Sequence, residues 1–229
     1  MKAKFQRTPL CERPFPDYTH SEEMWNMGTH LFGAFCTLVM MYIAVRSALD
    51  SGSSMAVVST VVYMVAILAM FSLSAIYHGL PKGMPKQVMR VVDHCNIFVT
   101  IAGTYTPITL LGICSVNPTL GWWVFGIEWG LAVVGILFNA IDLKKYSKFS
   151  MTCYLGMGWC VLISMREAIQ SMTLAGFMWI IAGGVAYTIG AVLYMIGKKK
   201  QIRYMHTVFH VFVVIAAVLQ FIGVWKYLL

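Results

Sequence analysis

Charge is what this sequence has least of. Only 11% of its 229 residues are charged, whereas 59% are hydrophobic and the mean hydropathy is +0.73. A soluble domain carries about 25% charged residues, so this chain has too few to cover a surface that faces water. The composition therefore excludes an ordinary soluble protein and favours the lipid bilayer as the solvent.

A signal peptide and a cysteine motif are also absent. The first 20 residues are polar, contain Pro9, Pro14 and Pro16, and hold no apolar core of the kind that a secretory signal requires. The six cysteines form no CxxC pair and mostly fall in apolar stretches, as expected of thiols that pack as small hydrophobic groups. We therefore expect an uncleaved first membrane anchor and no cysteine-based site.

Long apolar runs dominate what remains. A membrane-spanning helix needs about 20 such residues, and seven runs approach that length: 24–46, 55–79, 94–113, 121–140, 149–166, 173–197 and 204–226. They predict an all-α membrane protein, a seven-transmembrane helix bundle over residues 23–229. A short polar cytoplasmic segment, residues 1–22, precedes it, and Thr19 with Glu22 fits the capping box of a first helix.

The positive charges predict the orientation of this bundle. Of 17 Lys and Arg residues, 14 lie in the N-terminal segment and in the second, fourth and sixth links, at 2–13, 82–90, 144–148 and 198–203. The positive-inside rule makes that side cytoplasmic, so the N-terminus is expected inside and the C-terminus outside. Topology and anionic headgroups explain the net charge of +8, and we expect no nucleic-acid partner.

Four ionisable residues are predicted to lie at one depth in this bundle. His78 ends the second run, Asp93 precedes the third, and His206 and His210 open the seventh. With the orientation above, all four fall near the inner headgroup boundary. Ionisable groups in or beside a membrane are costly and mark functional sites.

The spacing of these residues suits a catalytic metal site. His206 and His210 are one helical turn apart, as are Ser74 and His78, so each pair shares a helix face. Three imidazoles leave the fourth position of a tetrahedral zinc ion open for water. Asp93 is then a candidate to accept the proton of that water, and Ser74 to stabilise an oxyanion. The alternatives are histidines that face headgroups and a serine that bonds its own helix backbone.

Polar stripes on other runs indicate an interior cavity for a lipid-like ligand. Asp93, Asn96, Thr100 and Thr104 lie on one face of the third run, Asn26 and His30 on one face of the first, and Gln220 continues the face of His206 and His210. Such stripes should face protein or water rather than lipid. Hydrogen bonding between helices is the simpler explanation. Glu128, in the fourth run, has no evident partner.

Several motifs in chain order resemble those of a known family. They are Ser74-Ala-Ile-Tyr-His78, Asp93-His94, Ala102-Gly-Thr-Tyr-Thr-Pro107 and His206-Thr-Val-Phe-His210. They resemble the hemolysin III family, the bacterial branch of the progestin and adipoQ receptor (PAQR) superfamily. The resemblance implies seven helices in the cell membrane, a cytoplasmic N-terminus, and zinc held by His78, His206 and His210 with Ser74 and Asp93 nearby. The superfamily is similar to the alkaline ceramidases, which hydrolyse a lipid amide.

Three functions follow from this reading of the sequence. The first is a zinc-dependent intramembrane hydrolase of a lipid amide or ester. The second is a non-enzymatic sensor or regulator of membrane lipid state, in which zinc is structural. The third is the cytolysin that the family name suggests.

Overall fold

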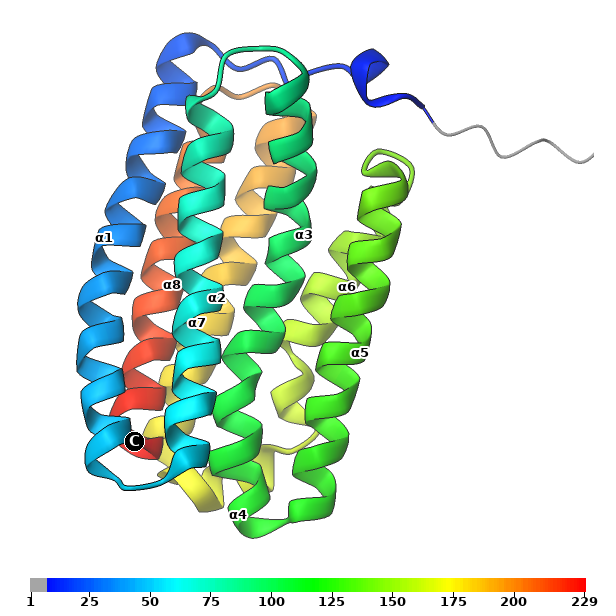
Figure 1. The fold of residues 1–229 in the computed structure, drawn as a ribbon. Coiled ribbons are helices and arrows are strands. Elements are labelled where there is room, and N and C mark those ends of the chain that lie inside the picture. Colours follow the sequence, from blue (N-terminus) through cyan, green and yellow to red (C-terminus); the bar gives the residue numbers. More distant parts are fainter. Residues whose placement is uncertain (1–7) are drawn as a thin grey trace, which may run out of the picture.

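The computed structural model describes residues 8–229, and the regular structure of these residues is helical (Figure 1). The elements in chain order are η1 (Leu10–Glu12), α1 (His20–Asp50), α2 (Ser54–Gly79), α3 (Met84–Pro107), η2 (Ile108–Ile113), α4 (Cys114–Val116), α5 (Pro118–Asp142), α6 (Ser147–Gly158), η3 (Cys160–Leu162), α7 (Met165–Lys200) and α8 (Met205–Leu228).

Six helical stretches in residues 8–229 are long and apolar enough to cross a membrane. They are His20–Asp50, Ser54–Gly79, Met84–Val116, Pro118–Asp142, Met165–Lys200 and Met205–Leu228. The third is continuous through α3, η2 and α4, and η2 is a π-helical turn that directly follows Pro107. An all-helical, multi-pass membrane protein is therefore confirmed.

The fifth apolar run differs from the prediction. Instead of one helix over 149–166, α6 ends at Gly158, η3 follows, and α7 begins at Met165 with a further break at Thr173, whose φ is 66°. The break exposes backbone groups that a membrane helix would pair internally. The Tyr105 hydroxyl meets two of them, since it donates to the carbonyl of Gly158 and accepts from the amide of Val161.

The first helix begins as its sequence predicts. The Thr19 hydroxyl accepts a hydrogen bond from the Glu22 amide at 3.2 Å, and the Glu22 carboxylate accepts one from the Thr19 amide at 2.9 Å. This capping box is confirmed. It starts α1 four residues before the apolar run, so the acidic residues of the first turn belong to the helix.

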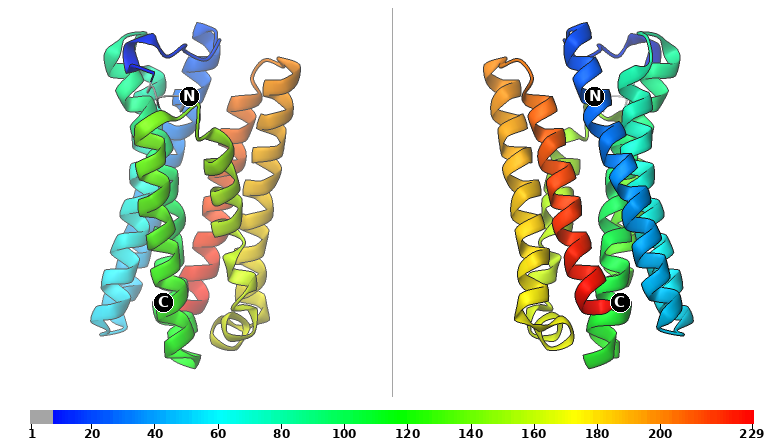
Figure 2. Two further views of the ribbon diagram at one scale, coloured as in Figure 1. Left: turned by 90° about the vertical axis from the view of Figure 1, so that its right-hand side faces the viewer. Right: turned by 90° about the vertical axis from the view of Figure 1, so that its left-hand side faces the viewer.

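The long helices pack side by side in one bundle, and α8 lies between α1 and α7 (Figure 2). The start of α1, the end of α7 and the start of α8 lie at the same end, and the chain ends at the other (Figures 1 and 2). Where α2 meets α3, a Cβ on Gly103 would lie 2.6 Å from that of Ala66, so this close approach requires glycine.

Candidate metal centre

Three histidines from two helices meet at the end of the bundle where α1 begins. His78 stands in the last turn of α2, and His206 and His210 stand in the first two turns of α8. The Nε2 atoms of His78 and His206 are 3.3 Å apart, and one ligand nitrogen from each of the three rings lies within 4.8 Å of the others. His78 and His210 are 2% exposed. The cluster can hold a metal ion.

Hydrogen bonds turn two of these rings toward the centre of the cluster. Nδ1 of His78 lies 2.6 Å from the Glu23 carboxylate, and Nδ1 of His210 lies 3.1 Å from the carbonyl oxygen of Asn26. A carbonyl oxygen only accepts, and a carboxylate favours a donor, so Nδ1 carries the proton in both rings. Nε2 is then left with its lone pair, as in metal-binding histidines that are oriented by an outer partner.

A buried lysine completes the surroundings of His78. The Lys86 ammonium lies 3.0 Å from the second oxygen of Glu23 and donates to the carbonyls of His78 and Leu80, at 3.1 Å and 2.8 Å. Lys86 is 2% exposed, and these three partners satisfy the donors of its ammonium group. Lys86 and His78 thus both favour the ionised form of Glu23, which holds His78 in place.

Sequence reasoning missed Glu23, which it did not single out as a site residue. A signal was present, because Glu23 lies three residues before Asn26 and seven before His30. The polar stripe of the first helix, extended back by one step, reaches Glu23. Lys86 gave no such signal, since it stands in a link where basic residues are expected on topological grounds.

The segment that precedes α1 covers the same end of the bundle. Arg90 donates to the carbonyl of Pro14 and Arg203 to that of Asp17, at 2.9 Å and 2.8 Å. The Tyr18 ring stacks on His206, with 5.2 Å between centroids and 13° between planes. Burial raises the pKa of the Tyr18 hydroxyl above its usual range, so the ring covers the cluster as a neutral phenol.

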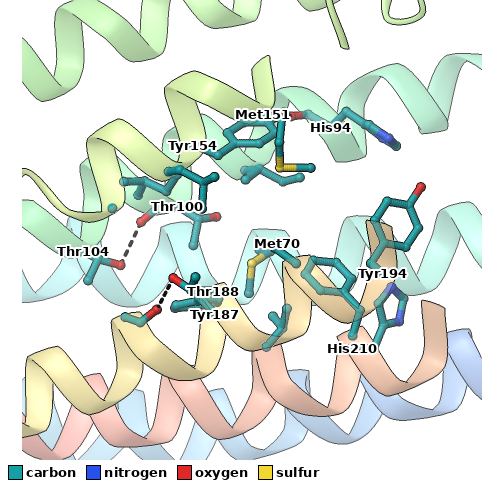
Figure 3. A pocket seen from close by; sticks show the side chains of 18 of the residues that line it. Met70, His94, Thr100, Thr104, Met151, Tyr154, Tyr187, Thr188, Tyr194 and His210 are labelled. Atoms are coloured by element: carbon teal, nitrogen blue, oxygen red, sulfur yellow. Dashed lines mark hydrogen bonds between the residues drawn. The ribbon is translucent and has the colours of Figure 1, made fainter. Parts of the chain in front are cut away.

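A cavity of about 220 Å³ extends from the cluster along the bundle, between residues of α2, α3, α6, α7 and α8. His206, His210, Asp93 and Ser74 line it together. Figure 3 shows His94 and His210 toward one end, and Thr100, Thr104 and Thr188 toward the other. These four residues, singled out from the sequence, therefore line one cavity.

Asp93 and Ser74 approach this space from different helices. Ser74 is 2% exposed and stands one turn before His78 on α2. Asp93 projects from α3, and its carboxylate lies 3.4 Å from Nδ1 of His94. That nitrogen lies closer, at 2.9 Å, to the carbonyl of Arg90, so His94 directs its Nδ1 proton to the backbone of its own helix.

Only two of the five residues expected to line the cavity do so. Thr100 and Thr104 are in its wall. Asn26 and His30 lie behind the cluster instead, where Asn26 accepts from Thr207 at 2.6 Å and His30 stacks on His210 with ring centroids 3.6 Å apart. Asn96 points to Thr100, at 3.4 Å. The helical periodicity of these polar residues identified the buried faces of the helices. Part of each face packs against neighbouring helices instead of facing the cavity.

Comparison with known proteins places this architecture in a family. The profile of the family described as Haemolysin-III related matches residues 18–221. "Hemolysin-3" of Bacillus cereus is 31% identical over 208 residues, which cover 91% of this chain and 92% of that protein. The "Hemolysin-3 homolog" of Bacillus subtilis is 32% identical over 210 residues, which cover 92% and 96%.

A more distant relative identifies the wider group. The "Adiponectin receptor protein" of Drosophila melanogaster is 24% identical over an alignment of 231 positions, gaps included, which spans 88% of this chain and 50% of that protein. This likeness connects the chain to the PAQR superfamily. The resemblance inferred from the motifs is confirmed: the chain belongs to the haemolysin-III-related family of multi-pass proteins of the cell membrane.

Proposed function

We propose that the chain is a zinc-dependent hydrolase that cleaves an amide or ester bond of a membrane lipid inside the bilayer. One observation carries the proposal. Three imidazoles with inward-facing nitrogens stand beside a carboxylate and a hydroxyl, at one end of an elongated cavity within the helix bundle. A lipid would fit this arrangement if its scissile headgroup bond lay at that end and its acyl chain lay along the cavity.

The donor set fits zinc. Ligand nitrogens at zinc's usual bond length are about 3.3 Å apart in a tetrahedral site, which is the separation of the His78 and His206 nitrogens. Nδ1 of His206 is buried and has no partner in residues 8–229, so this ring has no competing hydrogen bond that would turn it away. His78, His206 and His210 would hold the ion.

The surrounding residues then divide the chemistry. Bound zinc supplies Lewis acidity, which lowers the pKa of water to about 7. Asp93 accepts the proton from the attacking water and returns it to the leaving group. The Ser74 hydroxyl donates a hydrogen bond to the oxyanion that develops on the scissile carbonyl. The apolar wall excludes bulk water and aligns the chain.

The proposal includes seven membrane crossings with a cytoplasmic N-terminus. The broken segment from α6 through η3 would be the fifth crossing, because it leads from the end where α5 stops to the end where α7 starts (Figure 2). The basic residues support the orientation. The metal centre would then lie near the inner headgroups, where a scissile bond of an inner-leaflet lipid is found.

The test measures metal and product separately. Purified protein is reconstituted in liposomes, and lipid products are followed by mass spectrometry for wild type, Asp93→Asn and Asp50→Asn. Asp50 is exposed at the far end of α1 and serves as the matched control. We expect Asp93→Asn to keep its zinc and lose at least a hundredfold in turnover, with Asp50→Asn unchanged.

Two other outcomes favour the alternatives. Zinc that stays bound, with no lipid product that depends on Asp93, would support a sensor in which the ion is structural. Contacts to His78 from Glu23 of α1 and Lys86 of α3 favour that second candidate, because the ion would tie four helices together. Zinc-independent lysis of erythrocytes by the purified protein would support a cytolysin.

A further inference from the structure

The end of the cavity away from the metal centre contains a polar side chain with no hydrogen-bond partner among residues 8–229. Gln220 of α8 lines the cavity together with His210, ten residues further along the helix and hence about 15 Å away along its axis. Its side chain lies against Gly183 of α7, where a Cβ would overlap the Gln220 Cγ. Glycine thus makes room for Gln220.

The three threonine hydroxyls near this end are satisfied. The Thr100 hydroxyl donates to the carbonyl of Asn96 at 2.9 Å, and that of Thr104 to the carbonyl of Thr100 at 2.8 Å. Thr188 donates to the carbonyl of Gly184 at 2.8 Å and accepts from the Trp159 indole at 3.1 Å. Each hydroxyl is therefore occupied by its own helix or a neighbour.

The Gln220 amide is different, because it makes no hydrogen bond to any residue between 8 and 229. A primary amide has two donors and one acceptor oxygen. The residue is only partly buried, so its amide is open to an occupant of the cavity and favours one that supplies hydrogen-bond partners. The wall between this amide and the histidines is largely apolar, with Met70, Ile101 and Val213 among its residues. A ligand that suits both the Gln220 amide and this apolar wall would be an apolar chain with one polar substituent.

We propose that Gln220 binds a hydroxyl group on the chain of the lipid that occupies the cavity, about 15 Å from the metal centre. The amide oxygen accepts from the hydroxyl, and the amide nitrogen donates to it. The identification of this lipid with a substrate rests on the function proposed above, but the binding itself does not. An ordered water on Gln220 is the alternative occupant.

A binding experiment tests the proposal without hydrolysis. A fluorescent fatty acid is displaced from purified, detergent-solubilised protein by two unbranched fatty acids of equal length, one with a mid-chain hydroxyl and one without. We expect the hydroxylated acid to bind about fivefold to tenfold more tightly, as one net hydrogen bond allows. Moving the hydroxyl along the chain in wild type should give a maximum at one position.

Two variants test whether the preference for the hydroxylated acid depends on Gln220. Gln220→Met keeps an unbranched side chain beside Gly183 and should remove the preference while still binding the plain acid. Thr104→Val, the control, removes a hydroxyl that already has a partner and should keep the preference. Equal binding of the two acids by wild type, or a preference that survives in Gln220→Met, would overturn the proposal and leave water as the occupant.

The experiments distinguish failure of the hydrolase proposal from failure of the proposal for Gln220. Asp93→Asn should show the same preference as wild type, because Asp93 lies at the other end of the cavity. A protein that prefers the hydroxylated acid but forms no lipid product would retain this inference and lose the proposed function. A protein that forms product but does not discriminate between the two acids would support the proposed function and overturn this inference.

Discussion

Nδ1 of His78 and Oε2 of Glu23 are 2.6 Å apart, and this contact joins the second helix to the first beside the metal centre. Glu23 contacts no other histidine of the cluster, and its second oxygen binds Lys86. The carboxylate thus acts on the centre only through the orientation and basicity of one ring.

Glu23→Gln should weaken metal binding by about tenfold to a hundredfold, because an amide holds the His78 proton less strongly than a carboxylate does. Competition with a chromophoric chelator measures the affinity. Glu22→Gln is the matched control, since Glu22 contacts Thr19, Arg203 and Tyr204 instead. Equal affinities in the two variants would show that Glu23 only supports the fold.

The sequence predicted the cluster better than its surroundings, for a physical reason. Helical spacing puts His206 beside His210, and the alternation of charged links puts His78 at the same end. Both are regularities along the chain. The contact of Glu23 with His78 joins positions 55 residues apart and depends on how α1 and α2 pack, which no local pattern specifies.

The fifth apolar run shows a second limit of prediction from sequence. Its hydrophobicity matches that of a membrane helix, and on that basis one continuous span was predicted. Whether a helix continues depends on where its backbone groups find partners. Here the Tyr105 hydroxyl, more than 50 residues earlier in the chain, pairs with Gly158 and Val161 and so stabilises a break that hydropathy does not reveal.

His30 and His210 should differ in metal binding although their rings are stacked. His210→Ala removes a ligand and should lower bound metal to well below one ion per protein. His30→Phe keeps an aromatic ring against His210 and should leave the metal content unchanged, because His30 lies outside the cluster of three. Elemental analysis of the purified variants checks this. Loss of metal from His30→Phe would mean that His30 is itself a ligand.

Tyr18→Ala should speed the loss of metal to a chelator by about tenfold, because it removes a ring that stacks on His206 and excludes water from the site. Stopped-flow mixing with a hydrophilic chelator gives the rate. Tyr42→Ala is the control, since this tyrosine is 71% exposed on α1. Unchanged rates in Tyr18→Ala would indicate that metal leaves by another route, such as the cavity.

Two glycines of the bundle should respond differently to the same substitution. Gly103→Ala places a methyl group 2.6 Å from the Cβ of Ala66, and overpacking of this kind costs about 1 to 3 kcal/mol. Gly126 belongs to a GxxxG pattern, yet no atom of residues 8–229 lies within 4 Å of a Cβ built on it, so Gly126→Ala should leave the monomer's stability nearly unchanged. Thermal unfolding in detergent separates the two. If Gly126→Ala destabilised the protein as much as Gly103→Ala, its face of α5 would have to be packed in the folded protein, because only a close neighbour makes an added methyl group costly there.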